Sequence, residues 1–326
     1  MWCINSPDHD PYFNLASEEY LLKTYTEDIF LLYRNNPAIV VGKHQNTMAE
    51  VNLSYVLERG IKVTRRISGG GTVYHDLGNL NFAFITTGEE GRLVDYGKYT
   101  LPIIRAMESL GIKATLGPRN ELLLGKLKIS GTASHVHKKR VLHHGTLLFD
   151  SELEHLSAAL KVRQGKFRDR AVRSIPSKVT NIRGHLKTQM DVNEFQEKVF
   201  RHVLEAQENA TEYEFRLEDL QEINGLVQRK YDTWEWNFGY SPRYEYRKSI
   251  SVESGTVHLQ LQVEKGIIRG VNLTGDFMST KQVYVLEELL IGAIHDPETL
   301  RTKLSGIRVE DYITGLDSEG LLSGMF

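Results

Sequence analysis

The chain has 326 residues, of which 40% are hydrophobic, and its formal net charge is −2. Such a length allows a large core and suggests about two domains, while the near-neutral charge gives the whole molecule no strong preference for nucleic acid or an anionic membrane. A single cysteine, Cys3, excludes a disulfide framework and a cysteine-rich metal site. Without a signal-peptide pattern or an apolar span of membrane length, the sequence predicts a cytoplasmic protein.

Hydrophobic period and turn residues predict both strands and helices in the first half of the chain, without the regular alternation of a dinucleotide-binding fold. Strands are predicted over residues 29–33, 38–42, 61–66, 80–85, 121–124, 126–133 and 141–149, and helices over residues 14–22, 53–58 and 99–110. The last two strands are joined by a turn over residues 137–140. This pattern predicts an α+β fold in which a mostly antiparallel, mixed sheet and its helices form a large domain over residues 1–243.

The second half begins with a strongly basic segment. Residues 161–187 contain nine lysines or arginines and one acid, Asp169. A segment of this composition cannot bury much surface, so we expect a mobile loop over part of its length. Asp191 is placed to cap a helix that runs to about Glu205, and a linker-like stretch follows through Arg243.

The C-terminal residues predict a second, smaller domain over residues 244–326. Alternating strands are predicted over residues 249–252, 257–263 and 267–271, and helices over residues 283–293 and 297–304. Gly255 and Gly266 mark the turns between the strands. This domain is therefore also expected to be α+β.

The segment 65–79 carries the strongest chemical signal, because Arg65 and Arg66 precede a run of three glycines and His75. Glycines let the backbone approach a ligand and turn its N–H groups toward oxygen atoms, and arginine supplies paired donors for phosphate or carboxylate. We interpret the segment as an anion-binding loop; a tight turn between strands is the alternative. The spacing matches neither a dinucleotide-binding fingerprint nor a P-loop.

A lysine, two adjacent histidines and a serine are further candidates for chemical groups. Lys128 lies on a predicted strand, so it either points an isolated charge into a cleft or lies on a solvated face. His143 and His144 point to opposite faces of a strand, which argues against one metal held by both. Ser68 lacks a nucleophile elbow, and no base or orienting acid is identifiable from the sequence, so a role as hydrogen-bond donor is favoured.

Several motifs follow one another in the order of a known family. They are Tyr33-Arg34-Asn35-Asn36-Pro37, Gly42-Lys43-His44-Gln45-Asn46, the block 65–79, Gly117-Pro118-Arg119-Asn120-Glu121, Lys128-Ile129-Ser130-Gly131-Thr132-Ala133, His143-His144-Gly145-Thr146-Leu147-Leu148, Ser177-Lys178-Val179-Thr180-Asn181 and Thr233-Trp234-Glu235-Trp236-Asn237-Phe238-Gly239. On these residues the chain resembles the lipoate–protein ligase A family, within the biotin/lipoate protein ligase superfamily. The likeness spans residues 11–239 and continues more weakly to the C-terminal domain.

The resemblance implies an ATP-dependent ligase with two half-reactions. Lipoate attacks the α-phosphate of ATP to give lipoyl-AMP and pyrophosphate, and a lysine of a carrier domain then attacks the lipoyl-AMP and releases AMP. The implied carriers are E2 subunits of 2-oxoacid dehydrogenases and the H protein of glycine cleavage, with no nucleic acid or membrane partner. Mg²⁺ is implied with ATP, but its protein ligands are unknown from the sequence.

The resemblance also implies roles for individual residues. Lys128 is the implied catalytic residue, in contact with both the lipoate carboxyl group and the α-phosphate. The implied ATP and adenylate site comprises Arg66, Gly71, Thr72, Val73, Tyr74 and Lys128. The implied lipoate site comprises Arg66, Ser68, Gly70, His75, Lys128 and His144, and the implied adenylate loop comprises Lys178, Val179, Thr180 and Asn181. Family members commonly have aspartate at the position of Glu121, so a metal or phosphate role for this acid is not carried over.

Other functions stay open at the level of sequence. An ATP-independent transferase that moves lipoyl or octanoyl groups between carrier proteins is disfavoured, because Cys3 lies in no nucleophile motif. A biotin ligase is disfavoured because its Gly-Arg-Gly-Arg-x-Gly type of loop is absent from the sequence. A non-catalytic binder of a nucleotide or of a lipoyl domain would differ from a ligase in showing no turnover.

Overall fold

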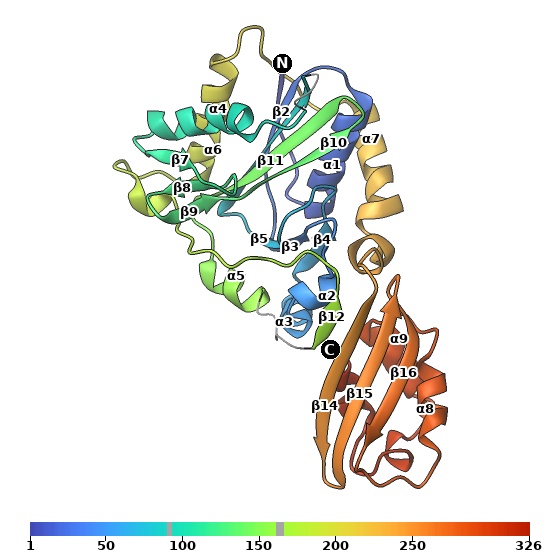
Figure 1. The fold of residues 1–326 in the computed structure, drawn as a ribbon. Helices are drawn as coiled ribbons and strands as arrows, with labels where there is room; N and C mark the ends of the chain where they lie inside the picture. Colours follow the sequence, from blue (N-terminus) through green and yellow to red (C-terminus); the bar gives the residue numbers. More distant parts are fainter. Residues whose placement is uncertain (90–92, 161–165) are drawn as a thin grey trace. The chain divides into compact units, whose positions relative to one another are not determined.

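A computed structural model describes residues 1–89, 93–160 and 166–326. The chain divides into two compact units (Figure 1). The large unit comprises Met1–Lys43, Val56–Leu160 and Ser174–Thr233, and the small unit comprises His44–Tyr55, Lys161–Arg173 and Trp234–Phe326. Because the units are not continuous in sequence, the boundary expected between residues 243 and 244 stays a prediction.

A six-stranded mixed sheet, in the order β10-β11-β6-β2-β1-β13, is the centre of the large unit. Smaller sheets have the orders β4-β3-β5 and β7-β8-β9. The strands are β1 (Trp2–Asn5), β2 (Ile29–Arg34), β3 (Ala38–Val41), β4 (Lys62–Arg65), β5 (Val73–His75), β6 (Asn79–Thr87), β7 (Ala114–Leu116), β8 (Leu122–Leu124), β9 (Leu127–Ser130), β10 (Thr132–His137), β11 (Arg140–Leu148) and β13 (Thr211–Glu212). In the main sheet, β2, β6, β11 and β10 pair antiparallel, whereas β1 pairs parallel with both β2 and β13.

Helices cover both faces of this sheet (Figure 1). The helical elements of the large unit are α1 (Pro11–Thr24), α4 (Tyr96–Ser109), α5 (Leu153–Ala159), α6 (Val192–Glu205), α7 (Leu217–Leu226), a 3₁₀ turn (Arg183–His185) and a π-helical turn (Val227–Tyr231). Side chains of α4 and α6 form one core with Phe30, Phe82 and Phe84 of the sheet. Successive strand residues point to opposite faces, so Leu31 and Ala83 lie on the other face, which α1 contacts.

Two sequence-based predictions for the large unit are wrong. The strand expected over residues 126–133 is broken at Gly131 into β9 and β10, which belong to different sheets. The linker-like stretch expected before Arg243 contains α7 and the π-helical turns. Asn224-Gly225 is a typical turn dipeptide and hides this helix from a sequence-based reading. By contrast, the cap expected at Asp191 is confirmed, because its carboxylate accepts from the N–H groups of Asn193 and Glu194.

The small unit is a second α+β assembly whose sheet has the order β12-β14-β15-β16. Its elements are α2 (Thr47–Glu50), β12 (Phe167–Asp169), a π-helical turn (Glu235–Gly239), β14 (Tyr244–Val252), β15 (Gly255–Glu264), β16 (Ile267–Gly275), α8 (Val283–Leu290), α9 (Pro297–Leu304), a 3₁₀ turn (Val309–Asp311) and α10 (Ser318–Gly324); α3 (Leu53–Glu58) contributes to both units. Met48 packs against the C-terminal core. The described part of the chain contains no helix long and apolar enough to cross a membrane.

Candidate active site

The glycine loop that follows β4 is closed by the side chain of Arg66. Its Nε donates to Ser68 Oγ at 3.0 Å, its Nη1 to the carbonyl of Val40 at 3.1 Å, and its Nη2 to the carbonyls of Gly69 and Gly71 at 2.7 and 2.8 Å. Burial lowers the pKa of Arg66 to about 10, so the group keeps its charge at neutral pH. The guanidinium therefore shapes the loop from inside, and its contact with a ligand stays a prediction.

Ser68 is the first member of a buried chain of hydrogen bonds. Its Oγ lies 2.6 Å from Nε2 of His144 on β11, and Nδ1 of His144 lies 2.8 Å from a carboxylate oxygen of Glu18 on α1. Tyr33 on β2 donates to the other oxygen of Glu18 at 2.9 Å. Each of these side chains is less than a tenth exposed. The base and the acid that the sequence could not identify for Ser68 are therefore both present, brought together from separate elements.

His75 presents a hydrogen-bond donor to the same region. Nδ2 of Asn35 lies 2.9 Å from Nδ1 of His75, and Asn35 is oriented by Asn14, whose Nδ2 donates to Asn35 Oδ1 at 2.8 Å. Burial lowers the pKa of His75 to about 3, and the nearby charge of Arg66 adds to this shift. The neutral ring thus carries its hydrogen on Nε2, which is buried and has no hydrogen-bond partner. An unpartnered buried donor is suited to an anionic ligand.

Lys128 on β9 is the second cationic group of the site. Burial lowers its pKa, the charge of Glu121 opposes this shift, and Arg119 and Arg66 add to it. The ammonium group lies over Gly131, where an added β-carbon would come within 3.2 Å of Nζ. Lys128 and His75 both lie near enough to Arg66 for its charge to lower their pKa values.

The predicted adenylate loop lies directly beside Lys128. The backbone N–H of Lys128 donates to the carbonyl of Lys178, and the N–H of Thr180 donates to the carbonyl of Lys128, so Val179 forms a parallel bridge with the strand. Asn181 anchors this segment through two hydrogen bonds with the backbone of Ser151. Residues 161–165 of the predicted basic loop lie outside the described residues, and its mobility stays a prediction.

The predicted nucleotide residues after the glycines lie along the loop and β5. The N–H of Thr72 donates to Ser174 Oγ at 2.9 Å, and a β-carbon on Gly71 would come within 3.1 Å of the same oxygen. Val73 and His75 alternate with Tyr74, which is buried on the opposite face of the strand. Ser174 is thus a neighbour of the loop that the sequence reasoning missed, because about a hundred residues separate it from the glycines.

Two candidate groups have other roles in this structure. The carboxylate of Glu121 accepts from the backbone N–H of Arg119 at 2.8 Å and closes the turn that begins at Gly117. Cys3 on β1 is buried, and burial raises the pKa of its thiol to about 11, which makes it a poor nucleophile. Within the described residues, no group of three His, Cys, Asp or Glu side chains could hold a metal ion.

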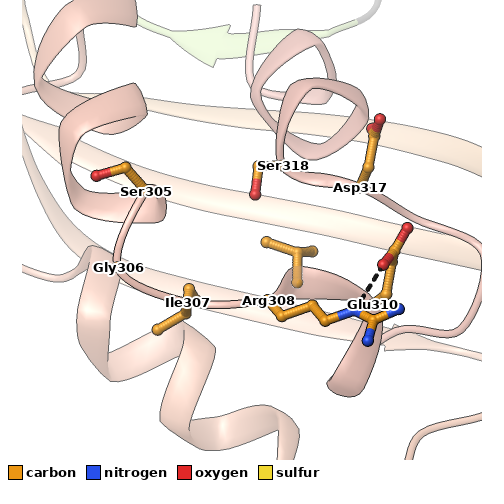
Figure 2. A pocket seen from close by; sticks show the side chains of 8 residues that line it. Ser305, Gly306, Ile307, Arg308, Glu310, Asp317 and Ser318 are labelled. Carbon is orange, nitrogen blue, oxygen red and sulfur yellow. Dashed lines mark hydrogen bonds and ion pairs between the residues drawn. The ribbon is translucent and has the colours of Figure 1, made fainter.

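Each of the two units has a cavity of its own. In the large unit, a narrow cavity is lined by Phe82, Tyr96, Tyr99, Thr100, Thr132, Ala133, His143 and His144. There His143 stacks on Tyr99 at 4.1 Å, on the face opposite to the bonds of His144, as the strand alternation predicts. In the small unit, an open depression of about 310 Å³ lies between Ser305 and Ser318 (Figure 2) and contains none of the predicted site residues.

Comparison with known proteins identifies the family. The family model of the lipoyl protein ligase A/B catalytic domain matches residues 10–204, more than half of the chain. The chain belongs to this family. The family model of the bacterial lipoate protein ligase C-terminus matches residues 241–324. The resemblance inferred from the motifs is thus confirmed, and the chain is an enzyme of the lipoate–protein ligase class.

Individual relatives agree with the family over nearly the whole length. The lipoate–protein ligase LplJ of Bacillus subtilis is 38% identical and the match covers 98% of this chain and 97% of that protein; lipoate–protein ligase 1 of Staphylococcus aureus is 39% identical over 96% of each. A putative lipoate protein ligase of Thermoplasma acidophilum, solved with lipoic acid bound, superposes with a TM-score of 0.62 at 25% identity, over 73% of this chain and 98% of its own. A lipoate–protein ligase A solved with ATP has a TM-score of 0.61 at 25% identity, with the same coverages. The predicted α+β fold is therefore confirmed.

Proposed function

We propose that the residues around the glycine loop activate lipoate with ATP and then pass the lipoyl group to a lysine of a carrier domain. Lipoic acid and ATP are the ligands of the two structural neighbours at 25% identity. The ammonium group of Lys128 and the Nε2–H of His75 suit a site for two anions. The observation that carries the proposal is a half-buried lysine and a buried, unpartnered donor, both of which interact electrostatically with Arg66 of the glycine loop.

In the first half-reaction, a carboxylate oxygen of lipoate attacks the α-phosphorus of ATP. The new oxygen–phosphorus bond forms as the bond to the β-phosphate oxygen breaks, and pyrophosphate leaves. The ammonium group of Lys128 offsets the repulsion between the two anions and stabilises the charge that develops on the phosphate. The Nε2–H group of neutral His75 adds a hydrogen-bond donor to the site without placing another positive charge near Lys128 and Arg66.

In the second half-reaction, the amine of the carrier lysine attacks the carbonyl carbon of lipoyl-AMP and AMP leaves. The carriers in this proposal are E2 subunits of 2-oxoacid dehydrogenases and the glycine cleavage H protein. Mg²⁺ would enter with the phosphates of ATP, a common mode of binding for this ion. Glu121 is held in its turn by Arg119, and the described residues offer no dedicated metal cage. A cytoplasmic location stays a prediction.

A mass measurement on an acceptor domain tests the proposal. The acceptor, incubated with the protein, lipoate and Mg-ATP, is expected to gain the mass of one lipoyl group while pyrophosphate is released. A parallel reaction without ATP, in which a lipoylated or octanoylated carrier is the donor, tests the ATP-independent transferase. Transfer in the second reaction alone would overturn the ligase proposal in favour of that alternative, and the buried, weakly acidic Cys3 argues against this result.

A further inference from the structure

We propose that Ser68, His144 and Glu18 form a proton relay for the second half-reaction. The proposal rests on the proposed function, since it concerns how the carrier lysine loses a proton as it attacks lipoyl-AMP. An amine that forms an amide must release a proton, and a positioned base accelerates such a step. The first half-reaction needs neither His144 as a base nor Glu18.

The direction of the hydrogen bonds follows from the groups themselves. An ionised carboxylate only accepts, so the hydrogen between His144 and Glu18 belongs to Nδ1 of the imidazole. Nε2 of neutral His144 is therefore an acceptor, and the hydroxyl of Ser68 donates to it across 2.6 Å. Arg66 in turn donates to the Ser68 oxygen at 3.0 Å. Each group in this series of hydrogen bonds is therefore assigned as a donor or an acceptor without conflict.

The charges at the two ends favour proton movement toward His144. The guanidinium of Arg66 contacts Ser68 and stabilises negative charge on its oxygen, while the carboxylate of Glu18 stabilises an imidazolium at His144. Tyr33 holds the second oxygen of Glu18 and fixes the plane of the carboxylate. The other titratable rings beside His144 are His75 and His143, whose pKa values are lowered mainly by burial, so both stay neutral at pH 7.

The transfer step balances in atoms and charge. The nitrogen of the unprotonated amine forms a bond to the carbonyl carbon, and the bond from that carbon to the phosphate oxygen of AMP breaks. The amine proton passes to Ser68 Oγ as the Ser68 proton passes to His144 Nε2. An imidazolium paired with Glu18 results, and it returns the proton to solvent after AMP leaves. Ser68 touches the reacting amine in this step, whereas Glu18 acts through His144 and is a positioning residue.

Glu18→Gln is the test substitution, because it keeps the size of the side chain and an acceptor for Tyr33. The amide of glutamine can donate to Nδ1, and the hydrogen of His144 would then move to Nε2, where it cannot accept from Ser68. From preformed lipoyl-AMP, transfer to the acceptor lysine is expected to slow by about 100-fold or more, the usual contribution of a general base. Pyrophosphate release in the first half-reaction is expected to change little.

Hydroxylamine separates the relay from a structural role. This amine is unprotonated and strongly nucleophilic at neutral pH, so its reaction with lipoyl-AMP on the protein should be much less affected by Glu18→Gln. Glu19→Gln is the matched control, because Glu19 is the next buried acid on α1 and binds Lys23, Lys230 and Tyr231 instead of His144. That variant is expected to transfer lipoyl groups to lysine at the wild-type rate.

Several results would overturn the relay. Unchanged transfer to lysine in Glu18→Gln would do so, as would equal loss of the lysine and hydroxylamine reactions. An acyl adduct on Ser68, found in the denatured protein after adenylate formation without acceptor, would replace the relay by a covalent route. Failure of the wild-type protein to release pyrophosphate from ATP and lipoate would instead contradict the proposed function, so the two failures are distinguishable.

Discussion

The glycines of the loop differ in backbone conformation and in the space available for a side chain. Gly70 has a φ of +90°, a conformation that favours glycine, and a β-carbon there would come within 3.0 Å of Arg66 Nη2. A β-carbon on Gly69 would meet nothing within 4 Å. The three glycines look equivalent in the sequence, but only Gly70 has a backbone conformation that favours glycine.

Gly70→Ala is expected to lower the free energy of unfolding by about 1–2 kcal/mol, because alanine is strained in a left-handed conformation. It should also slow pyrophosphate release, since the added methyl group displaces the guanidinium that closes the loop. Urea unfolding and a pyrophosphate assay measure the two effects. Gly69→Ala is the control and should be close to neutral in both; a larger loss in Gly69→Ala than in Gly70→Ala would contradict this account.

Lys128→Ala is expected to slow adenylate formation by about 100- to 1,000-fold, the range for removal of one group that stabilises a developing charge. The substitution leaves no buried charge behind, so the chain should fold. Pyrophosphate release in the presence of lipoate is the measurement. Lys126→Ala is the matched control, because Lys126 is exposed two residues away and should be dispensable. Comparable losses in both variants would show that Lys128 acts through general surface charge.

At the residue scale, the motif resemblance selected five site residues, which are Arg66, Ser68, His75, Lys128 and His144. In the structure, the other four residues connect to Arg66 through hydrogen bonds or electrostatic interactions, which is consistent with one site. Their binding roles stay predictions. Glu18 and Asn35 were missed as site residues because each acts through a histidine that lies far away in sequence. A signal for Glu18 does exist in the sequence, because two adjacent acids, Glu18 and Glu19, lie between the apolar pairs 15–16 and 21–22 of one helix. Charged side chains are rarely buried unless paired, so such a pair predicts buried polar partners.

At the scale of elements, hydrophobic period predicted those strands and helices that bury one face, and it failed where burial is slight. Helix α7 buries only Asp219 and Ile223. Its start is instead held by Asp219, whose carboxylate accepts from the hydroxyls of Tyr20, Tyr25 and Tyr213. Such contacts from outside the helix, two of them from residues about 200 positions away, leave no periodic pattern, which explains why the helix was not predicted.

Asp219→Ala is expected to lower the free energy of unfolding by about 2 kcal/mol or more, because several hydroxyl groups and the backbone N–H of Arg216 lose their acceptor. Glu218→Ala provides the control, since Glu218 is exposed in the same helical turn. Chemical denaturation followed by circular dichroism measures both variants. An equal effect of the two substitutions would rule out the tyrosine contacts as the cause.

Burial of His295 is expected to make the stability of the small unit depend on pH. Burial lowers its pKa to about 4, although the carbonyl of Met325 and the charge of Asp296 oppose the shift. An unfolded histidine titrates near 6.5, so as the pH falls from about 7 to 4 the unfolded chain binds a proton that the folded chain does not. Stability therefore falls across this window, by an amount on the order of 3 kcal/mol.

His295→Gln removes this titration while an amide can still bond to Tyr244 and to the carbonyl of Met325. The variant should show a shallower loss of stability between pH 7 and pH 4 than the wild-type chain. Urea midpoints measured at several pH values provide the comparison. Identical slopes in the two proteins would mean that His295 does not contribute.

At the scale of the whole molecule, the fold class followed from the order of elements, but the grouping of segments did not. Residues 44–55 belong to the small unit, where Met48 packs against its core and Thr47 donates to the carbonyl of Asn237 at 2.6 Å. β12 likewise pairs with β14. These contacts join residues far apart in sequence, so no local pattern of hydrophobicity or charge can predict them.

Truncation of the chain after residue 243 tests this grouping against a boundary between residues 243 and 244. The shortened protein should lose amide protection over residues 47–50 and 167–169, because β14 and the C-terminal core that cover them are gone. Hydrogen exchange with mass spectrometry measures this loss. β6 in the large unit should keep its protection and serves as the internal control. Full protection of residues 47–50 and 167–169 in the truncated chain would favour the sequence-based boundary.

The hydrogen bond between Thr47 and Asn237 can form only late in synthesis of the chain. The two residues are 190 positions apart. At about 5–20 residues per second, a ribosome needs roughly 10–40 s to reach the second after making the first. Throughout that interval Thr47 lacks its bond to Asn237 and Met48 lacks the C-terminal core against which it packs, although the strands on either side of this segment, β3 and β4, can already pair. Nascent-chain binding by chaperones should therefore concentrate on this short segment and end when the C-terminal core emerges.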